Sequence, residues 1–227
     1  ARRHRRLGLP QGGRSRVSGR DFELVPLDCP SCGAGVAAEG EDVVYYCTAC
    51  RNGYVFDEAE RSLERLEVGF VAAPNVAVER YLPFWRLPAR VEVLDRKASG
   101  SAFSGLVGFF MGGSDRAPTP GEGDFAVPAF HCPLGELAAL TRRYTERLPE
   151  LDERLGERLT GGRYGVADAR KLAHYALIAG EIGRSDVLTE LRYRIDFGAP
   201  RLLGVPFVRH DGRLVDGVFG LGASAEP

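Results

Sequence analysis

The sequence predicts an α+β fold in which a small cysteine-rich unit precedes a mixed domain of antiparallel strands and two or three amphipathic helices. Two pairs of cysteines lie close together near the start of the chain. Runs that alternate apolar and polar residues, the pattern of half-buried strands, then flank a central region whose leucines recur at helical spacing. The 227 residues are enough for one or two domains.

The two cysteine pairs have the Cys-x-x-Cys spacing, formed by Cys29 with Cys32 and by Cys47 with Cys50. Two thiolates on a tight turn can bind one metal ion, and two such turns supply four sulfurs at the corners of a tetrahedron. Glycines, Gly33 and Gly53, follow each pair, where we expect the chain to turn sharply. The spacing therefore predicts one structural Zn²⁺ per chain, with all four cysteines as ligands.

Residues 43–46 and 54–56 are valine- and aromatic-rich, which indicates two strands beside the second cysteine pair. Two cysteine turns combined with a strand hairpin resemble a zinc ribbon, and the resemblance covers residues 21–60. It implies a metal-built platform that could not bury enough apolar surface to fold without the ion. Zinc ribbons occur in transcription, translation and replication proteins, so the resemblance by itself implies no particular function.

Disulfides, a redox pair and an iron–sulfur site are the alternatives for these cysteines. No secretory signal or membrane span precedes them, which favours a cytoplasmic location where thiols stay reduced. A thioredoxin-like motif would be a single Cys-x-x-Cys beside a βαβ pattern, and the sequence has neither feature. An iron–sulfur site would accept the same four thiolates and stays open.

Residues 1–20 are predicted to form a disordered basic arm, because they contain almost no apolar residues. The arm carries seven arginines and no acid, which gives it a net charge of +7. Because the net charge of the whole chain is −1, the remaining residues have a net charge of −8. One interpretation is an arm that binds nucleic acid, and the other is a solvated tail. The candidate nucleic-acid contacts are Arg2, Arg3, Arg5 and Arg6.

The remaining residues, 61–227, are predicted to form the α+β domain. Two prolines in the aromatic run 81–88 are expected to restrict pairing there to a sheet edge or a bulge. Asp211 and Gly212 predict a hairpin turn within a C-terminal antiparallel meander. Strand patterns occur at 66–71, 81–88, 91–95, 125–130, 187–197, 202–208 and 214–219.

Three amphipathic helices are predicted between these strands. Apolar residues recur at helical spacing in 137–148, in 151–159 and in 172–179. Pro133 suits the first position of the first helix, and Asp168 suits the cap of the third. The resulting helices should pack against the C-terminal strands.

A long loop rich in glycine and aromatic residues is predicted at 97–124. Its apolar run, 102–112, is too short to cross a bilayer, and its glycines weaken an independent helix. Exposed apolar patches usually meet a partner, so we predict contact with another protein or with a second copy of the chain. Burial in the chain's own core and contact with a bilayer surface are the alternatives. The predicted contact residues are Phe103, Leu106, Phe109, Phe110 and Met111.

No catalytic constellation emerges from the sequence. His131 and Cys132 are adjacent and would point to opposite faces of a strand, so they form no dyad with each other, and Cys132 is expected to be a buried apolar residue. His174 is expected at the core or its boundary. The segment between the first and last cysteine contains acids but no Lys or Arg, which disfavours nucleic acid. The prediction is a non-catalytic interaction or assembly subunit of a larger protein complex, with a nucleic-acid-binding protein as the alternative.

Overall fold

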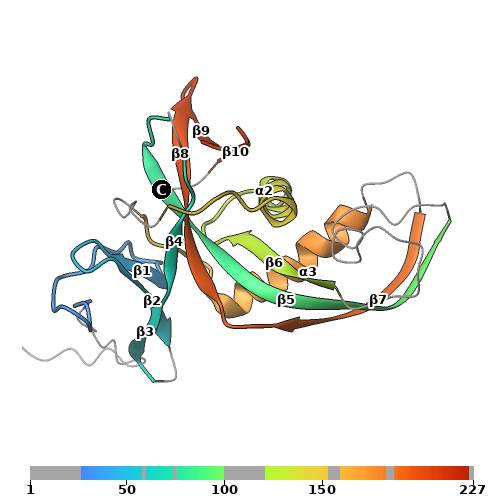
Figure 1. The fold of residues 1–227 in the computed structure, drawn as a ribbon, viewed down its shortest axis with the longest axis horizontal. Helices are drawn as coiled ribbons and strands as arrows, with labels where there is room; N and C mark the ends of the chain where they lie inside the picture. Colours follow the sequence, from blue (N-terminus) through green and yellow to red (C-terminus); the bar gives the residue numbers. More distant parts are fainter. Residues whose placement is uncertain are drawn as a thin grey trace, which may run out of the picture.

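The structure, a computed structural model, describes residues 27–57, 60–73, 76–99, 121–152, 159–182 and 187–224. Strands dominate this part of the chain, which contains two sheets and the two helices α2 and α3 (Figure 1). The predicted α+β class is therefore wrong, because the described chain is mostly β. Runs that look like separate short strands merge into long ones, and one of the three predicted helices is not formed where the structure describes it.

The smaller sheet has the antiparallel order β1-β2-β3 and belongs to the cysteine-rich unit. All four residues of β1 are buried, because the strand has a core on each of its faces. Val44 and Tyr46 contribute to the large core of the molecule, whereas Tyr45 and Cys47 face a small core around the cysteines. The strands are β1 (Val44–Cys47), β2 (Asn52–Asp57) and β3 (Ser62–Leu66).

The larger sheet is built on the 20-residue strand β5 (Arg80–Ser99). One edge of β5 pairs with β6, and the other edge pairs first with β8 and then with β7. The predicted C-terminal meander is thus only partly formed: β8 and β9 are a hairpin, but β7 and β8 follow each other along one edge of β5. The remaining strands are β4 (Val68–Phe70), β6 (Gly121–Pro128), β7 (Val187–Phe197), β8 (Arg201–His210), β9 (Arg213–Asp216) and β10 (Gly222–Ala223).

Two prolines lie inside β5, although β5 is the central strand of this sheet. The N–H and C=O of one strand residue point to the same edge, so each carbonyl shows where the missing N–H would point. The carbonyl of Pro83 accepts the N–H of Ala129, just beyond the end of β6. The carbonyl of Pro88 accepts the N–H of Gly198, in the break between β7 and β8. Each proline therefore faces an interruption of the neighbouring strand, which explains why a central strand tolerates both.

Side chains of β5 alternate between two cores, because successive strand residues point to opposite faces. Trp85 and Leu87 pack in the large core, which includes the inner face of α3 (Val166–Ile182). Leu82 and Phe84 pack in a second core, which includes α2 (Leu134–Glu146). The sheet is therefore covered on both faces near its centre.

The first and third predicted helices are confirmed as α2 and α3. Asp168 lies within the first turn of α3, so it does not cap the helix as predicted. The second predicted helix, 151–159, is wrong where the structure describes it, which is at its two ends. Leu151 makes a β-bridge to Val71, and Leu159 makes one to Tyr81. Leucines at helical spacing can also lie in separate extended contacts, so their spacing alone did not distinguish a helix from strands.

Candidate metal centre

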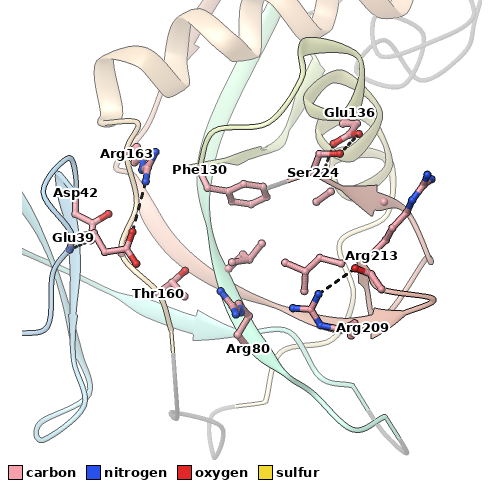
Figure 2. A pocket seen from close by; sticks show the side chains of 16 residues that line it. Glu39, Asp42, Arg80, Phe130, Glu136, Thr160, Arg163, Arg209, Arg213 and Ser224 are labelled. Carbon is pink, nitrogen blue, oxygen red and sulfur yellow. Dashed lines mark hydrogen bonds and ion pairs between the residues drawn. The ribbon is translucent and has the colours of Figure 1, made fainter. Parts of the chain in front are cut away.

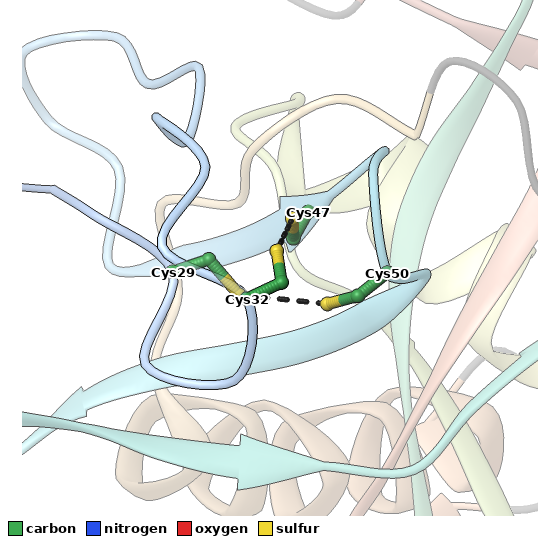
Figure 3. Close-up of side chains that lie close together, drawn as sticks. All are labelled: Cys29, Cys32, Cys47 and Cys50. Atoms are coloured by element: carbon green, nitrogen blue, oxygen red, sulfur yellow. Dashed lines mark hydrogen bonds between the residues drawn. The ribbon is translucent and has the colours of Figure 1, made fainter.

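The four cysteines of the two pairs lie close together and could bind a metal ion (Figure 3). The Sγ atoms of Cys29 and Cys50 are 3.5 Å apart, those of Cys32 and Cys47 are 3.7 Å apart, and all four lie within 4.8 Å of one another. A tetrahedral ion with metal–sulfur bonds of about 2.3 Å places its sulfurs about 3.8 Å apart. A disulfide requires about 2.05 Å, so these residues are free thiols. The donor set and its spacing fit one tetrahedral metal ion.

Both cysteine turns close in the same way. Gly33 donates its N–H to the carbonyl of the first cysteine of its pair at 2.8 Å, and Arg51 does so at 2.7 Å. Both residues have positive φ, 72° for Gly33 and 60° for Arg51. Gly53 was predicted to serve the second turn, but it lies within β2. Its role is close packing, since a Cβ at Gly53 would lie 2.6 Å from the side chain of Val68.

Polar groups surround the sulfurs and can orient them. The hydroxyl of Tyr54, a residue only 1% exposed, lies 3.1 Å from Sγ of Cys29 and 2.8 Å from Oγ of Ser31. Asn52 donates its Nδ2 to Sγ of Cys50 at 3.2 Å. Such outer partners fix the ligands and disperse thiolate charge. The cysteine spacing alone did not indicate these residues, although Asn52 and Tyr54 follow the last cysteine closely on β2.

The thiols differ strongly in acidity. Burial opposes ionisation of Cys29, but hydrogen bonds from Tyr54 and from the backbone N–H groups of Ser31 and Cys32 outweigh it and lower its pKa to about 6. The backbone N–H of Ala34 favours the thiolate of Cys32, but hydrogen bonds with the other sulfurs and burial raise its pKa to about 12. Without a cation, the four crowded sulfurs cannot all be thiolates, because their negative charges repel. A bound metal ion would remove this repulsion by taking each thiolate as a ligand.

The cysteine-rich unit is attached to the rest of the molecule through the segment 159–164. The carbonyl of Gly162 accepts the N–H groups of Val43 and Val44, and the N–H of Gly162 returns a bond to Val44. On the other side, Arg163 and Tyr164 donate to the carbonyl of Ala129. The segment therefore connects β1 directly to the larger sheet.

The other predicted site residues fall into two groups. Arg2, Arg3, Arg5, Arg6 and the run 102–112 with Phe103, Leu106, Phe109, Phe110 and Met111 lie outside the described residues. Cys132 is half-buried in the second core, as expected of an apolar cysteine. Burial, together with the charge of Glu136, raises its pKa to about 12, so the thiol stays protonated. Neighbouring His131 packs against the ring of Tyr164.

Neither of the helices in the described ranges has the length and apolar character needed to cross a bilayer. No family model matches the chain, and searches of the curated proteins and of the solved structures found no match either. The four-cysteine centre is therefore recognised by its geometry and its donor atoms alone.

Proposed function

We propose that the four cysteines hold one Zn²⁺ and that the ion has a structural role. The observation that carries this proposal is the closed set of four sulfurs within 4.8 Å of one another. Four thiolates are a ligand set of structural zinc sites, and they leave no position for a substrate or an activated water. The short separations suit one ion better than a cluster that carries its own sulfides. Free thiols persist in a reducing compartment, which supports a cytoplasmic location.

We further propose that the protein is a non-catalytic interaction or assembly subunit. Support comes from β7, an 11-residue strand that pairs only with β5 among the strands described. The ribbon formed by these two strands extends away from the rest of the sheet (Figure 1). An open strand edge exposes N–H and C=O groups that a strand of another chain can complete. A partner would then join the sheet at β7, with the zinc ion stabilising the opposite end of the molecule.

Metal analysis of protein expressed without added metal tests the first part. About one zinc per chain is expected for a single four-thiolate site. Visible absorbance with iron in place of zinc would contradict it.

Co-purification from the native source tests the second part, with Thr189→Pro on β7 as the variant. Thr189 has no partner in the β5–β7 register, which shifts between Lys97 and Ala98. A proline there removes an N–H outside that register, so partner or self-association should be lost if β7 is the contact edge. A stable complex of unchanged composition with a correctly folded Thr189→Pro variant would exclude that edge.

A further inference from the structure

A cavity of about 610 Å³ opens between the cysteine-rich unit, the β8–β9 hairpin and the start of α2 (Figure 2). Its volume lies within the range of about 300–1,000 Å³ found for small-molecule sites. The ring of Phe130 and the side chains of Leu82 and Leu214 give it an apolar surface. Phe130 and Leu82 are buried residues of the second core, so this surface is held rigidly.

Two arginines are brought together at one side of this cavity by a single carboxylate. Arg209 contacts Glu79 through two nitrogens, Nε to Oε2 at 3.1 Å and Nη2 to Oε1 at 2.8 Å. Nη2 of Arg80 lies 3.4 Å from the same Oε1 atom. Nη1 of Arg209 also donates to the carbonyl of Gly212 at 3.1 Å, which fixes the guanidinium against the hairpin turn. One carboxylate neutralises one of the two cations, so the pair retains one uncompensated positive charge at the cavity wall.

Acidic side chains of the other walls already have partners. Glu136 accepts both the N–H of Ser224 at 2.7 Å and its hydroxyl at 3.0 Å. Asp42 accepts the N–H of Glu39 at 2.7 Å. On the same side as Asp42, Arg163 is paired with Glu39 at 3.6 Å and with Glu41 at 3.4 Å, and Arg213 lines the cavity from the hairpin. The Arg80–Arg209 pair is therefore a part of the wall that suits one carboxylate.

We propose that this cavity binds an organic monoanion, a carboxylate joined to an apolar body of about the size of one aromatic ring. The carboxylate would lie against Arg80 and Arg209, since a guanidinium matches a carboxylate through paired N–H donors. The apolar body would pack on Phe130 and Leu82. Arg80 and Leu82 are two positions apart on β5 and so share one face of the strand, which places the charged and apolar parts side by side. The binding groups belong to β5, β8 and the segment after β6, so the inference goes beyond the proposed zinc site and does not rest on which metal the cysteines bind.

Phenylacetate and its neutral analogue phenylacetamide are suitable probes, with binding followed through backbone amide chemical shifts. Phenylacetate is expected to give saturable shifts at cavity residues such as Gly161 and Ser224. Phenylacetamide is expected to bind at least about tenfold more weakly, because it lacks the charge-assisted hydrogen bonds. Equal binding of the two probes would overturn the proposal. So would the absence of a saturable shift both with phenylacetate and with a peptide that ends in a free phenylalanine carboxylate.

Arg80→Gln provides the second test, with Arg192→Gln on the exposed face of β7 as the matched control. Arg80→Gln is expected to weaken phenylacetate binding about tenfold or more, and Arg192→Gln to leave it unchanged. Unchanged affinity in a folded Arg80→Gln protein would contradict the assignment.

A short peptide ending in phenylalanine, with a free or an amidated carboxyl terminus, distinguishes the sources of the anion. Binding of the free-acid peptide alone would identify the C-terminus of a partner chain, whereas binding of phenylacetate as well identifies a site that accepts free carboxylates.

Discussion

The hydroxyl of Tyr144 on α2 donates a 2.7 Å hydrogen bond to Oδ1 of Asp216 at the end of β9, and both side chains are buried. Asp216 also accepts the N–H groups of Val218, Phe219 and Leu221. A buried carboxylate is costly without such partners, and here four donors satisfy it. The interaction holds the turn between β9 and β10 in place and joins it to α2.

Removing the Tyr144 donor should destabilise the protein. We expect Tyr144→Phe to lower the free energy of unfolding by about 1–3 kcal/mol, because the buried carboxylate of Asp216 loses one of its four donors. Burial, together with the nearby charge of Asp216, raises the pKa of Tyr144, so the hydroxyl remains a donor at neutral pH. Urea unfolding measures the loss. The control is Tyr175→Phe, whose side chain is exposed on α3 and should change stability little; equal losses in both variants would contradict the prediction.

Loss of the metal should destabilise the large core and not only the cysteine-rich unit. Val44 and Tyr46 of β1 pack in the same core as Trp85, the one tryptophan of the chain. The fluorescence of Trp85 during thermal unfolding should therefore shift to lower temperature after chelation, because metal binding is coupled to folding.

Variants separate this effect from general damage. Cys47→Ser should behave like chelated protein, and Cys132→Ser should keep both the metal and the transition temperature, because Cys132 is not among the clustered cysteines. If the Trp85 transition is the same with and without the chelator, the two units fold independently.

A methyl group added at Gly204 should strain the sheet. A Cβ at this position would lie 2.6 Å from the buried ring of Phe70 on β4, so the ring or one of the two strands must shift. We expect Gly204→Ala to cost about 1–3 kcal/mol, the usual range for overpacking a core. Gly135→Ala near the start of α2 is the matched control, since nothing lies within 4 Å of its Cβ and alanine favours helices. Thermal unfolding compares the two, and a Gly204→Ala protein as stable as the control would refute the clash.

His174 should make stability depend on pH near neutrality. Its ring packs beside Tyr193 and Phe197, and burial lowers its pKa. The unfolded chain then binds the proton at higher pH than the folded chain, so the contribution is fully present above about pH 6.5 and decreases as the pH falls below that value. Urea unfolding at pH 5.5 and 7.5 should show a smaller difference for His174→Gln than for the wild type. The control, His210→Gln at the exposed end of β8, should retain the wild-type difference. An unaltered pH difference in His174→Gln would contradict the assignment.

Features encoded by neighbouring residues were predicted correctly. The spacing of Cys29, Cys32, Cys47 and Cys50 specified the four ligand candidates, because a Cys-x-x-Cys turn is a local geometry. The alternation in residues 187–197 gave the bounds of β7, and Asp211 and Gly212 form the predicted hairpin turn with positive φ of 48° and 79°. The helix after Pro133 likewise needs only its own periodicity.

Relationships between distant residues were decided by the tertiary structure. No local pattern showed that β5 is the central strand, because two prolines predict a sheet edge. The sheet tolerates them because one faces the end of β6 and the other faces the break between β7 and β8. Arg80 and Arg209 are 129 positions apart, and only the pairing of β5 with β8 brings Arg209 to Glu79, the chain neighbour of Arg80. Leu151 and Leu159 have helical spacing, yet both lie in extended segments that bridge to Val71 and Tyr81. Spacing along the chain determines turns and single elements, whereas strand order and shared cores depend on which distant surfaces exclude water together.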